Sequence, residues 1–229
     1  MKKIEKPITI EEGDSFKVIL SKYGALALDK QENFSELIGE TIGDLDIEKG
    51  EITFEDITFP VQILGFYMKD ADQWSWAWDN EDIFGKDLII SSNEIKEIGK
   101  EFEINEFTFP VLNANFDDCH TLAMTSTALL GMDAYYAVSE EGLDIFVLIK
   151  SDLIKQNNSV EKFRNTYYTF QKNFNIYPKL AFESYTKLKG YIYKPHDDFS
   201  LAKIGEARVM VGFTERGNVT RILIFGDEE

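Results

Sequence analysis

Cysteine and histidine are nearly absent from this 229-residue chain. Cys119 is the single cysteine, and His120 and His196 are the two histidines. A lone cysteine forms no internal disulfide, and so few thiol and imidazole ligands suit neither zinc nor iron, so we expect no metal site and no cofactor. The chain also lacks the run of roughly 20 apolar residues that crosses a bilayer and an apolar leader. These absences predict a cytoplasmic protein with no membrane partner.

Positive charge is scarce as well. The chain carries 24 Lys and Arg against 41 Asp and Glu, a net charge of −17. Residues 1–149 hold 11 basic and 31 acidic residues, whereas residues 150–229 hold 13 and 10. An acidic protein repels nucleic acid and attracts basic protein surfaces. We therefore expect no nucleic-acid partner; the charge indicates either a basic protein partner or solubility alone.

The sequence motifs of common enzymes are missing too. The phosphate-binding patterns G-x-x-x-x-G-K and G-x-G-x-x-G do not occur, nor do the hydrolase patterns H-E-x-x-H and G-x-S-x-G. Nucleotide-handling and hydrolytic identities are therefore disfavoured. Whether the protein is an enzyme stays open, and we predict no catalytic residue.

What the chain does have is a cluster of all its tryptophans, Trp74, Trp76 and Trp78. Spacing by two places the three indoles on one face of a strand, with the smaller Ser75, Ala77 and Asp79 on the other. Residues 61–68 suit a partner strand, and the polar residues 69–73 suit the turn of a hairpin. Indoles gathered on one strand face indicate core; the alternative is a stacking platform for a sugar or base.

Hydrophobic periodicity predicts most of the remaining elements. We expect helices over residues 14–39, 91–102, 117–131 and 160–174, and hairpins over 43–54, 135–149 and 209–225. The helix over 117–131 is capped by Asp117 and Asp118, and Pro178 ends the one over 160–174. Residues 180–188 suit a helix, whereas residues 185–193 alternate as a strand does.

These elements predict an α+β fold. Connections between neighbouring strands are too short for crossover helices, so the sheet is an antiparallel one made of hairpins, with helices packed on it. Composition and charge change over residues 150–159. We therefore divide the chain into an acidic α+β domain (1–149) with the tryptophan strand and a smaller segment (150–229) with a helix and antiparallel strands. That segment is either a separate domain or part of the same fold.

Candidate binding residues cluster around the tryptophan strand and the helix over 117–131. Asn80 ends the strand, where it either points into a pocket or caps a turn. Cys119 and His120 start the helix, but adjacent helical residues point in different directions and cannot pair for catalysis. Aspartates and glutamates between residues 70 and 82 suit a hard cation or, without an EF-hand pattern, a solvated loop. The candidate binding residues are Trp74, Trp76, Trp78, Asp79, Asn80 and His120.

The stretch from Trp74 to Asn80, W-S-W-A-W-D-N, resembles the W-L-W-A-W-A-N signature of an uncharacterised bacterial family, a domain of unknown function. Residues 43–54 and 59–65 resemble two further segments of that family, and the resemblance spans roughly residues 10–150. Ser75 and Asp79 depart from the signature. The resemblance implies membership of a family and carries no activity with it.

Two functional hypotheses follow. The first is a non-catalytic interaction module that masks a basic protein, by analogy with the immunity proteins that neutralise bacterial toxins. The alternative is a small-molecule-binding protein or enzyme, with a pocket beside the Trp74–Asn80 strand that is lined by the helix over 117–131. No feature of the sequence predicts the oligomeric state.

Overall fold

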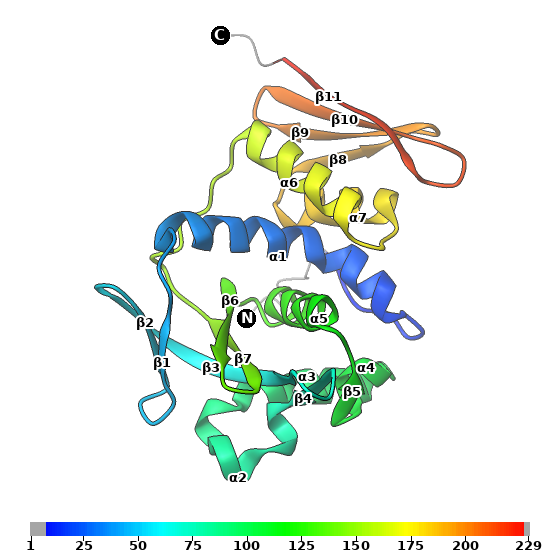
Figure 1. Ribbon diagram of the computed structural model, residues 1–229. Helices are drawn as coiled ribbons and strands as arrows, with labels where there is room; N and C mark the ends of the chain where they lie inside the picture. Colours follow the sequence, from blue (N-terminus) through cyan, green and yellow to red (C-terminus); the bar gives the residue numbers. More distant parts are fainter. Residues whose placement is uncertain (1–7, 227–229) are drawn as a thin grey trace, which may run out of the picture. The chain divides into compact units, whose positions relative to one another are not determined.

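The computed structural model describes residues 8–226 and confirms an α+β fold with two antiparallel sheets (Figure 1). Contacts divide the chain into two compact units, and the division falls within helix α1 (Phe16–Ile38). We call Lys30–Lys155 the tryptophan unit; Met1–Asp29 with Gln156–Glu229 form the C-terminal unit. The predicted division lies at residue 149, whereas the division by contacts also places residues 1–29 with the C-terminal part. Whether the two parts are separate domains stays a prediction.

The tryptophan unit holds a seven-stranded sheet. Its strands are β1 (Asp44–Asp46), β2 (Glu51–Phe54), β3 (Ile57–Met68), β4 (Gln73–Trp76), β5 (Val111–Asn113), β6 (Ala134–Glu140) and β7 (Leu143–Ile149). Its helices, besides the second part of α1, are η1 (Ala77–Asp79), α2 (Glu81–Phe84), η2 (Lys86–Leu88), α3 (Ile90–Glu101), α4 (Asn105–Thr108) and α5 (Phe116–Leu129). The predicted helices over 14–39, 91–102 and 117–131 and the predicted hairpins are confirmed.

The long strand β3 organises this sheet. It pairs with β2 through its first residues and with both β4 and β7 further on, so the β3–β4 hairpin and the central place of β7 are confirmed. Helix α5 covers one face (Figure 1), where His120 packs on Phe146 of β7. The other face lies against Phe34, Phe84 and Ile89. Both faces are therefore buried, as the apolar sequence of β7 requires.

The prediction that Trp78 lies on the strand is wrong. Strand β4 ends at Trp76, and Trp78 belongs to the 3₁₀ helix η1. Where the chain leaves the sheet, the Trp78 backbone N–H donates to the Ser92 hydroxyl of α3 at 3.1 Å instead of to a neighbouring strand. Spacing by two cannot reveal this turn, because it says nothing of where a short strand stops.

The cap of α5 also differs from the prediction. Asn115, not Asp117 or Asp118, is the N-cap residue, and its side chain accepts from the Asp118 backbone at 2.9 Å. The Asp118 carboxylate in turn accepts from the Asn115 backbone at 3.1 Å. This reciprocal pair is a capping box, which places the cap three residues before the acidic partner.

The C-terminal unit contains a four-stranded sheet and the first part of α1. Its further helices and strands are α6 (Val160–Asn173), α7 (Pro178–Leu188), β8 (Ile192–Pro195), β9 (Phe199–Ile204), β10 (Ala207–Phe213) and β11 (Val219–Phe225). The predicted helix over 160–174 and hairpin over 209–225 are confirmed. For residues 180–188 the helical alternative is correct, and Pro178 starts α7 instead of ending α6, because proline fits the first turn of a helix.

The strands of this sheet follow the order β11-β10-β9-β8, so β11 and β8 are its edges. Aromatic residues of α6 and α7 fill its core; Phe163 stacks on Tyr185 with ring centroids 4.5 Å apart. Lys189 and Asp29 form an ion pair of 2.6 Å that is almost wholly buried. None of the helices in residues 8–226 has the length and apolar character that crossing a membrane demands.

Candidate functional site

Trp74 and Trp76 lie in the core of the tryptophan unit. Both are fully buried, with ring centroids 5.2 Å apart in an edge-to-face arrangement. The Trp76 indole donates to the Glu106 carbonyl at 3.0 Å. A Cβ at Gly65 would lie 2.5 Å from the Trp74 ring, so the absent side chain makes room for that indole. The two rings are enclosed by protein and present no stacking surface.

Trp78 lies nearer the surface, against α3. Its backbone N–H donates to the Ser92 hydroxyl, which donates to the Leu64 carbonyl at 2.8 Å. The Lys96 ammonium sits 3.8 Å from the centroid of the Trp78 ring, within the range of a cation–π contact. Trp78 thereby joins η1 to α3 and, through Ser92, to β3.

Asn80 holds the turn after β4 together. Its side-chain amide donates to the Ser75 hydroxyl at 3.1 Å and to the Trp76 carbonyl at 2.9 Å. Its own carbonyl accepts from the Ile83 N–H at 3.0 Å, which starts α2. Asp79 points to solvent. The Asn80 side chain therefore caps the turn, one of the two roles considered for it, and makes no capping hydrogen bond to α2.

His120 of α5 belongs to an aromatic cluster between this helix and the sheet. Its Nδ1 lies 3.1 Å from the Tyr135 hydroxyl, and its ring meets Phe116 and Phe146 edge-on. Burial lowers the pKa of His120 and, together with nearby carboxylates, raises the pKa of Cys119 to about 12. At neutral pH the Cys119 thiol is therefore protonated and unsuited to nucleophilic attack. His120 meets the tryptophans through Phe146, which also touches Trp74.

One of the acidic residues between positions 70 and 82, Asp72, stabilises the β3–β4 turn. The Tyr67 hydroxyl donates to Asp72 at 2.5 Å, which raises the pKa of Tyr67 to about 12. Asp72 adopts the left-handed conformation (φ 49°) and its carbonyl accepts from the Ala114 N–H. Within residues 8–226, no three His, Cys, Asp or Glu side chains gather as a metal site would require.

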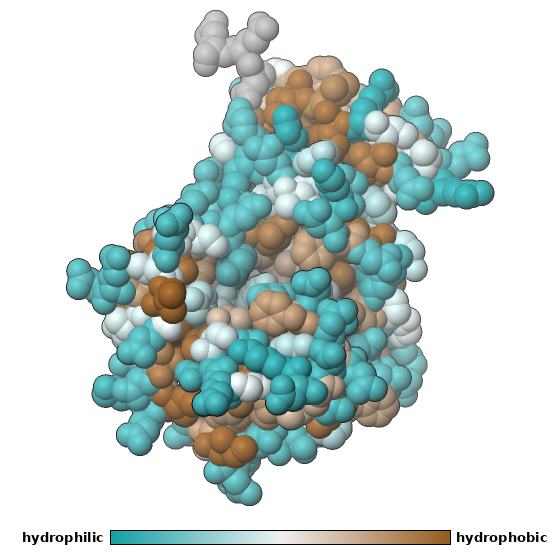
Figure 2. Space-filling model, in the orientation of Figure 1, coloured by the Kyte–Doolittle hydropathy of each residue, from teal (hydrophilic) through white to brown (hydrophobic). Residues whose placement is uncertain are grey.

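One stretch of the tryptophan unit combines charge with exposed apolar side chains. Residues 79–103, which we call the acidic segment, hold eight acidic residues and three lysines, and all eight acidic side chains are exposed. Ile83 on α2 is 68% exposed and Ile90 at the start of α3 is 52% exposed. Figure 2 shows apolar surface ringed by hydrophilic residues where α2 lies in Figure 1.

The charge of the whole chain resides in this unit. The tryptophan unit carries 8 basic and 27 acidic residues, a net of −19, whereas the C-terminal unit carries 16 and 14, a net of +2. The sequence revealed the acidity of this region. It did not reveal that Ile83 and Ile90 are exposed there, because isoleucine side chains are ordinarily expected to be buried. The acidic segment is the candidate functional site.

Comparison with known families matches residues 18–152 to the family of unknown function DUF6882. The chain belongs to DUF6882. The expectation of an uncharacterised domain family is thus confirmed, and the acidic segment lies inside the matched range. No curated protein and no solved structure matches the chain.

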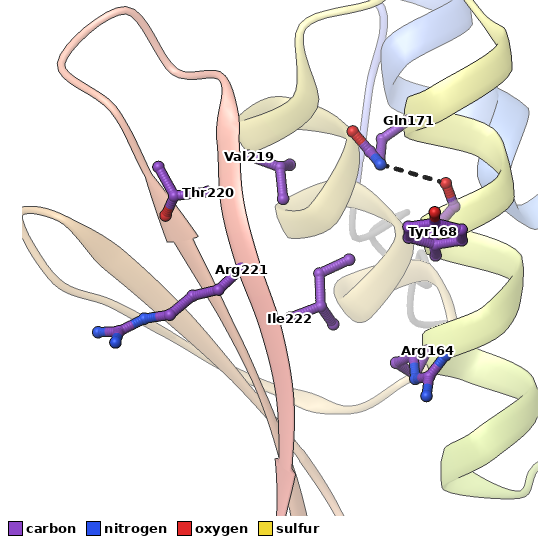
Figure 3. A pocket seen from close by; sticks show the side chains of 7 residues that line it. All are labelled: Arg164, Tyr168, Gln171, Val219, Thr220, Arg221 and Ile222. Atoms are coloured by element: carbon purple, nitrogen blue, oxygen red, sulfur yellow. Dashed lines mark hydrogen bonds between the residues drawn. The ribbon is translucent and has the colours of Figure 1, made fainter.

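A second feature lies outside the DUF6882 match, in the C-terminal unit. Arg164, Tyr168 and Gln171 line one side of a groove of about 330 Å³, and residues 219–222 of β11 line the other (Figure 3). The three helical residues are spaced by four and three, so they form one stripe along α6. Sequence reasoning missed this groove because periodicity does not reveal which strand edge lies beside which helix.

Proposed function

We propose that this DUF6882 member is a non-catalytic, cytoplasmic bacterial protein-interaction module whose acidic segment binds a basic protein. The observation that carries the proposal is the pair of exposed isoleucines, Ile83 and Ile90, among eight exposed carboxylates. Protein interfaces commonly place apolar anchors inside a polar rim. Carboxylates around such anchors attract a basic partner over a distance and disfavour other partners.

The tryptophan motif supports this proposal by its structural role. Asn80 starts α2, and Trp78 fastens η1 to α3, so the motif holds the backbone from which the acidic segment projects. A rigid support lowers the entropy lost on binding. Masking of a basic toxin in the manner of an immunity protein is one form this function takes, and that comparison is an analogy.

The alternative is a small-molecule pocket beside the Trp74–Asn80 strand. The amide of Asn80 already donates two hydrogen bonds, and the rings of Trp74 and Trp76 are enclosed. The indole N–H groups of Trp74 and Trp78 are buried and have no hydrogen-bond partner among the described residues, which is the observation that favours a ligand there. The alternative stays a prediction. Saturable quenching of tryptophan fluorescence by one compound of a broad metabolite panel would support it over the proposal.

The test uses the full chain, immobilised and exposed at low salt to soluble proteins of its own source, with bound proteins identified by mass spectrometry. We expect a basic protein to bind and to be released by salt, because exposed charges are screened. The segment variant Asp82→Lys/Asp87→Lys/Glu94→Lys reverses three exposed charges. It should weaken binding of that protein by about tenfold or more.

The control is Glu40→Lys/Glu48→Lys/Glu141→Lys, which changes the net charge equally at exposed positions outside the acidic segment. It should retain most of the affinity. Ile83→Ser removes an apolar anchor without a change of charge and should also weaken binding. Equal losses in the segment variant and the control would mean diffuse charge attraction, and retention of no basic protein would leave the proposal without support; either result rejects it.

A further inference from the structure

We propose that the edge strand β11 and the groove beside α6 bind an extended acidic segment of another protein, which adds to the sheet as a fifth strand. This inference concerns the C-terminal unit and does not depend on the function of the acidic segment. It would give the chain a second interaction surface with the opposite charge preference.

The first observation is the free edge. β11 spans Val219–Phe225 and pairs with β10; in residues 8–226 it has no other strand as neighbour. An edge strand directs alternate N–H and C=O groups outward, where another chain can pair with them. Seven residues give an incoming strand enough length to pair.

The second observation is the groove along this edge. Ile222 and Val219 point toward α6, from which Tyr168 and Arg164 face them (Figure 3). Tyr168 is exposed, and the Lys172 ammonium lies 5.7 Å from its ring centroid. Alternate side chains of an added strand would enter this groove, where Ile222 and the Tyr168 ring lie beside Arg164. The Arg164 guanidinium donates to the Asn165 side chain at 2.7 Å and has further N–H groups for a carboxylate, so the lining suits an apolar residue beside an acidic one.

The third observation is the opposite face of β11. Leu223 and Phe225 lie on the side away from the helices and are 40% and 47% exposed. Arg221 points to the same side (Figure 3), and Arg208 is the cross-strand neighbour of Phe225. An added strand would place its remaining side chains beside these residues. On both faces of β11, the added strand would therefore meet apolar side chains next to basic ones.

A bulge shapes the strand at the groove. The pairing of β10 and β11 shifts between Gly212 and Phe213, so that Thr220 and Arg221 both lie over Gly212. A Cβ at Gly212 would come within 2.7 Å of the Thr220 hydroxyl and 3.1 Å of the Arg221 side chain, which only glycine avoids. Bulges bend the strand that carries them, and this one bends β11 beside α6.

The charge of the four-stranded sheet indicates which kind of segment would bind at β11. Strands β8 to β11 contain Lys194, Lys203, Arg208 and Arg221 and no aspartate or glutamate. The groove adds Arg164. A second copy of β11 would bring one arginine, Arg221, and no carboxylate, so it offers no opposite charge to Arg164, Arg208 or Arg221. A segment with alternating apolar and acidic residues has the complementary charge and the period of a strand.

The experiment measures binding of fluorescein-labelled peptides to the full chain by fluorescence polarisation. The probes are peptides of about ten residues made of Val, Ile and Glu, with glutamates on one strand face, on the other, or on both. We expect saturable binding with a Kd below about 1 mM for at least one peptide. The same peptide with every amide N-methylated has no N–H group to donate to an edge strand and should bind at least about tenfold more weakly.

Two charge variants locate the site. Arg164→Glu should weaken peptide binding about tenfold or more, and Tyr168→Ala should weaken it too, with far-UV circular dichroism unchanged. Lys194→Glu makes the same charge change on β8, the opposite edge, and should leave binding within about threefold. The proposal is overturned by binding of none of the peptides, by equal binding of the N-methylated peptide, by equal effects of the two charge variants, or by a doubled mass in light scattering that Arg164→Glu abolishes.

Discussion

Asn80→Ala tests whether the backbone turn that follows Trp76 depends on the Asn80 side-chain amide. The change removes the hydrogen bonds that Asn80 donates to the Ser75 hydroxyl and the Trp76 carbonyl. Each such bond contributes about 0.5–1.5 kcal/mol net, and a buried carbonyl left without a partner adds to the cost. Trp76 is fully buried. We therefore expect the free energy of unfolding to fall by about 2–3 kcal/mol.

Asn80→Asp sharpens the test. Aspartate has the same shape but no amide donor, so its carboxylate would face the Trp76 carbonyl at close range. Repulsion between these oxygens should make Asn80→Asp at least as destabilising as Asn80→Ala at neutral pH. A residue whose role is to receive a ligand would not show this order.

The assay is urea unfolding followed by tryptophan fluorescence. All three tryptophans lie in the tryptophan unit, so the signal reports the unfolding of that unit. Asn113→Ala is the control, since Asn113 is exposed and accepts one long hydrogen bond of 3.3 Å from Gln73; it should cost no more than about 0.5 kcal/mol. If Asn80→Ala or Asn80→Asp were as harmless as this control, the capping role of Asn80 would be refuted.

Three further changes have outcomes that the structure predicts. Gly65→Ala places a Cβ 2.5 Å from the Trp74 ring and 2.6 Å from the Ser75 carbonyl, so it should destabilise the tryptophan unit by about 3 kcal/mol or more in the same assay; a loss under about 1 kcal/mol would contradict the tight packing. Lys189→Met strands Asp29 in the C-terminal unit and should cost about 3–5 kcal/mol by circular dichroism; the double variant Asp29→Leu/Lys189→Met should recover much of it, and no loss in the single variant would refute the argument. Burial lowers the folded-state pKa of His120, so the unfolded chain takes up its proton first as pH falls through about 6.5, and stability is lost on the acid side. Lowering the pH from 7.5 to 5.5 should therefore reduce the free energy of unfolding of the wild type more than that of His120→Gln. Parallel curves of this free energy against pH would contradict the argument.

Periodicity identified the elements whose burial is one-sided or complete. The aromatic stripe of α6 predicts only a helix and the apolar run of β7 predicts only a strand, because few other conformations bury such residues together. Residues 185–193 show the limit: Tyr185 is buried on a helix, although its neighbours alternate as in a strand. Local pattern favours both forms there, and packing against Phe163 decides between them.

The candidate site was predicted in part. Charge located the acidic region, and the strand end at Asp79 and Asn80 pointed to the neighbourhood of α2. The role of Asn80 as a cap depends on distances to Ser75 and Trp76 that spacing along the chain does not reveal. Exposure of Ile83 and the groove at β11 depend equally on tertiary packing, which no single-sequence pattern carries.

The central claim is that the acidic segment binds a basic protein at a defined place. The most direct measurement is the affinity of the captured basic protein for the wild type, for Asp82→Lys/Asp87→Lys/Glu94→Lys and for the charge-matched control Glu40→Lys/Glu48→Lys/Glu141→Lys, over a range of salt. We predict that the segment variant alone loses about tenfold or more in affinity and that its dependence on salt becomes shallower. Indistinguishable affinities of the two variants would contradict the claim.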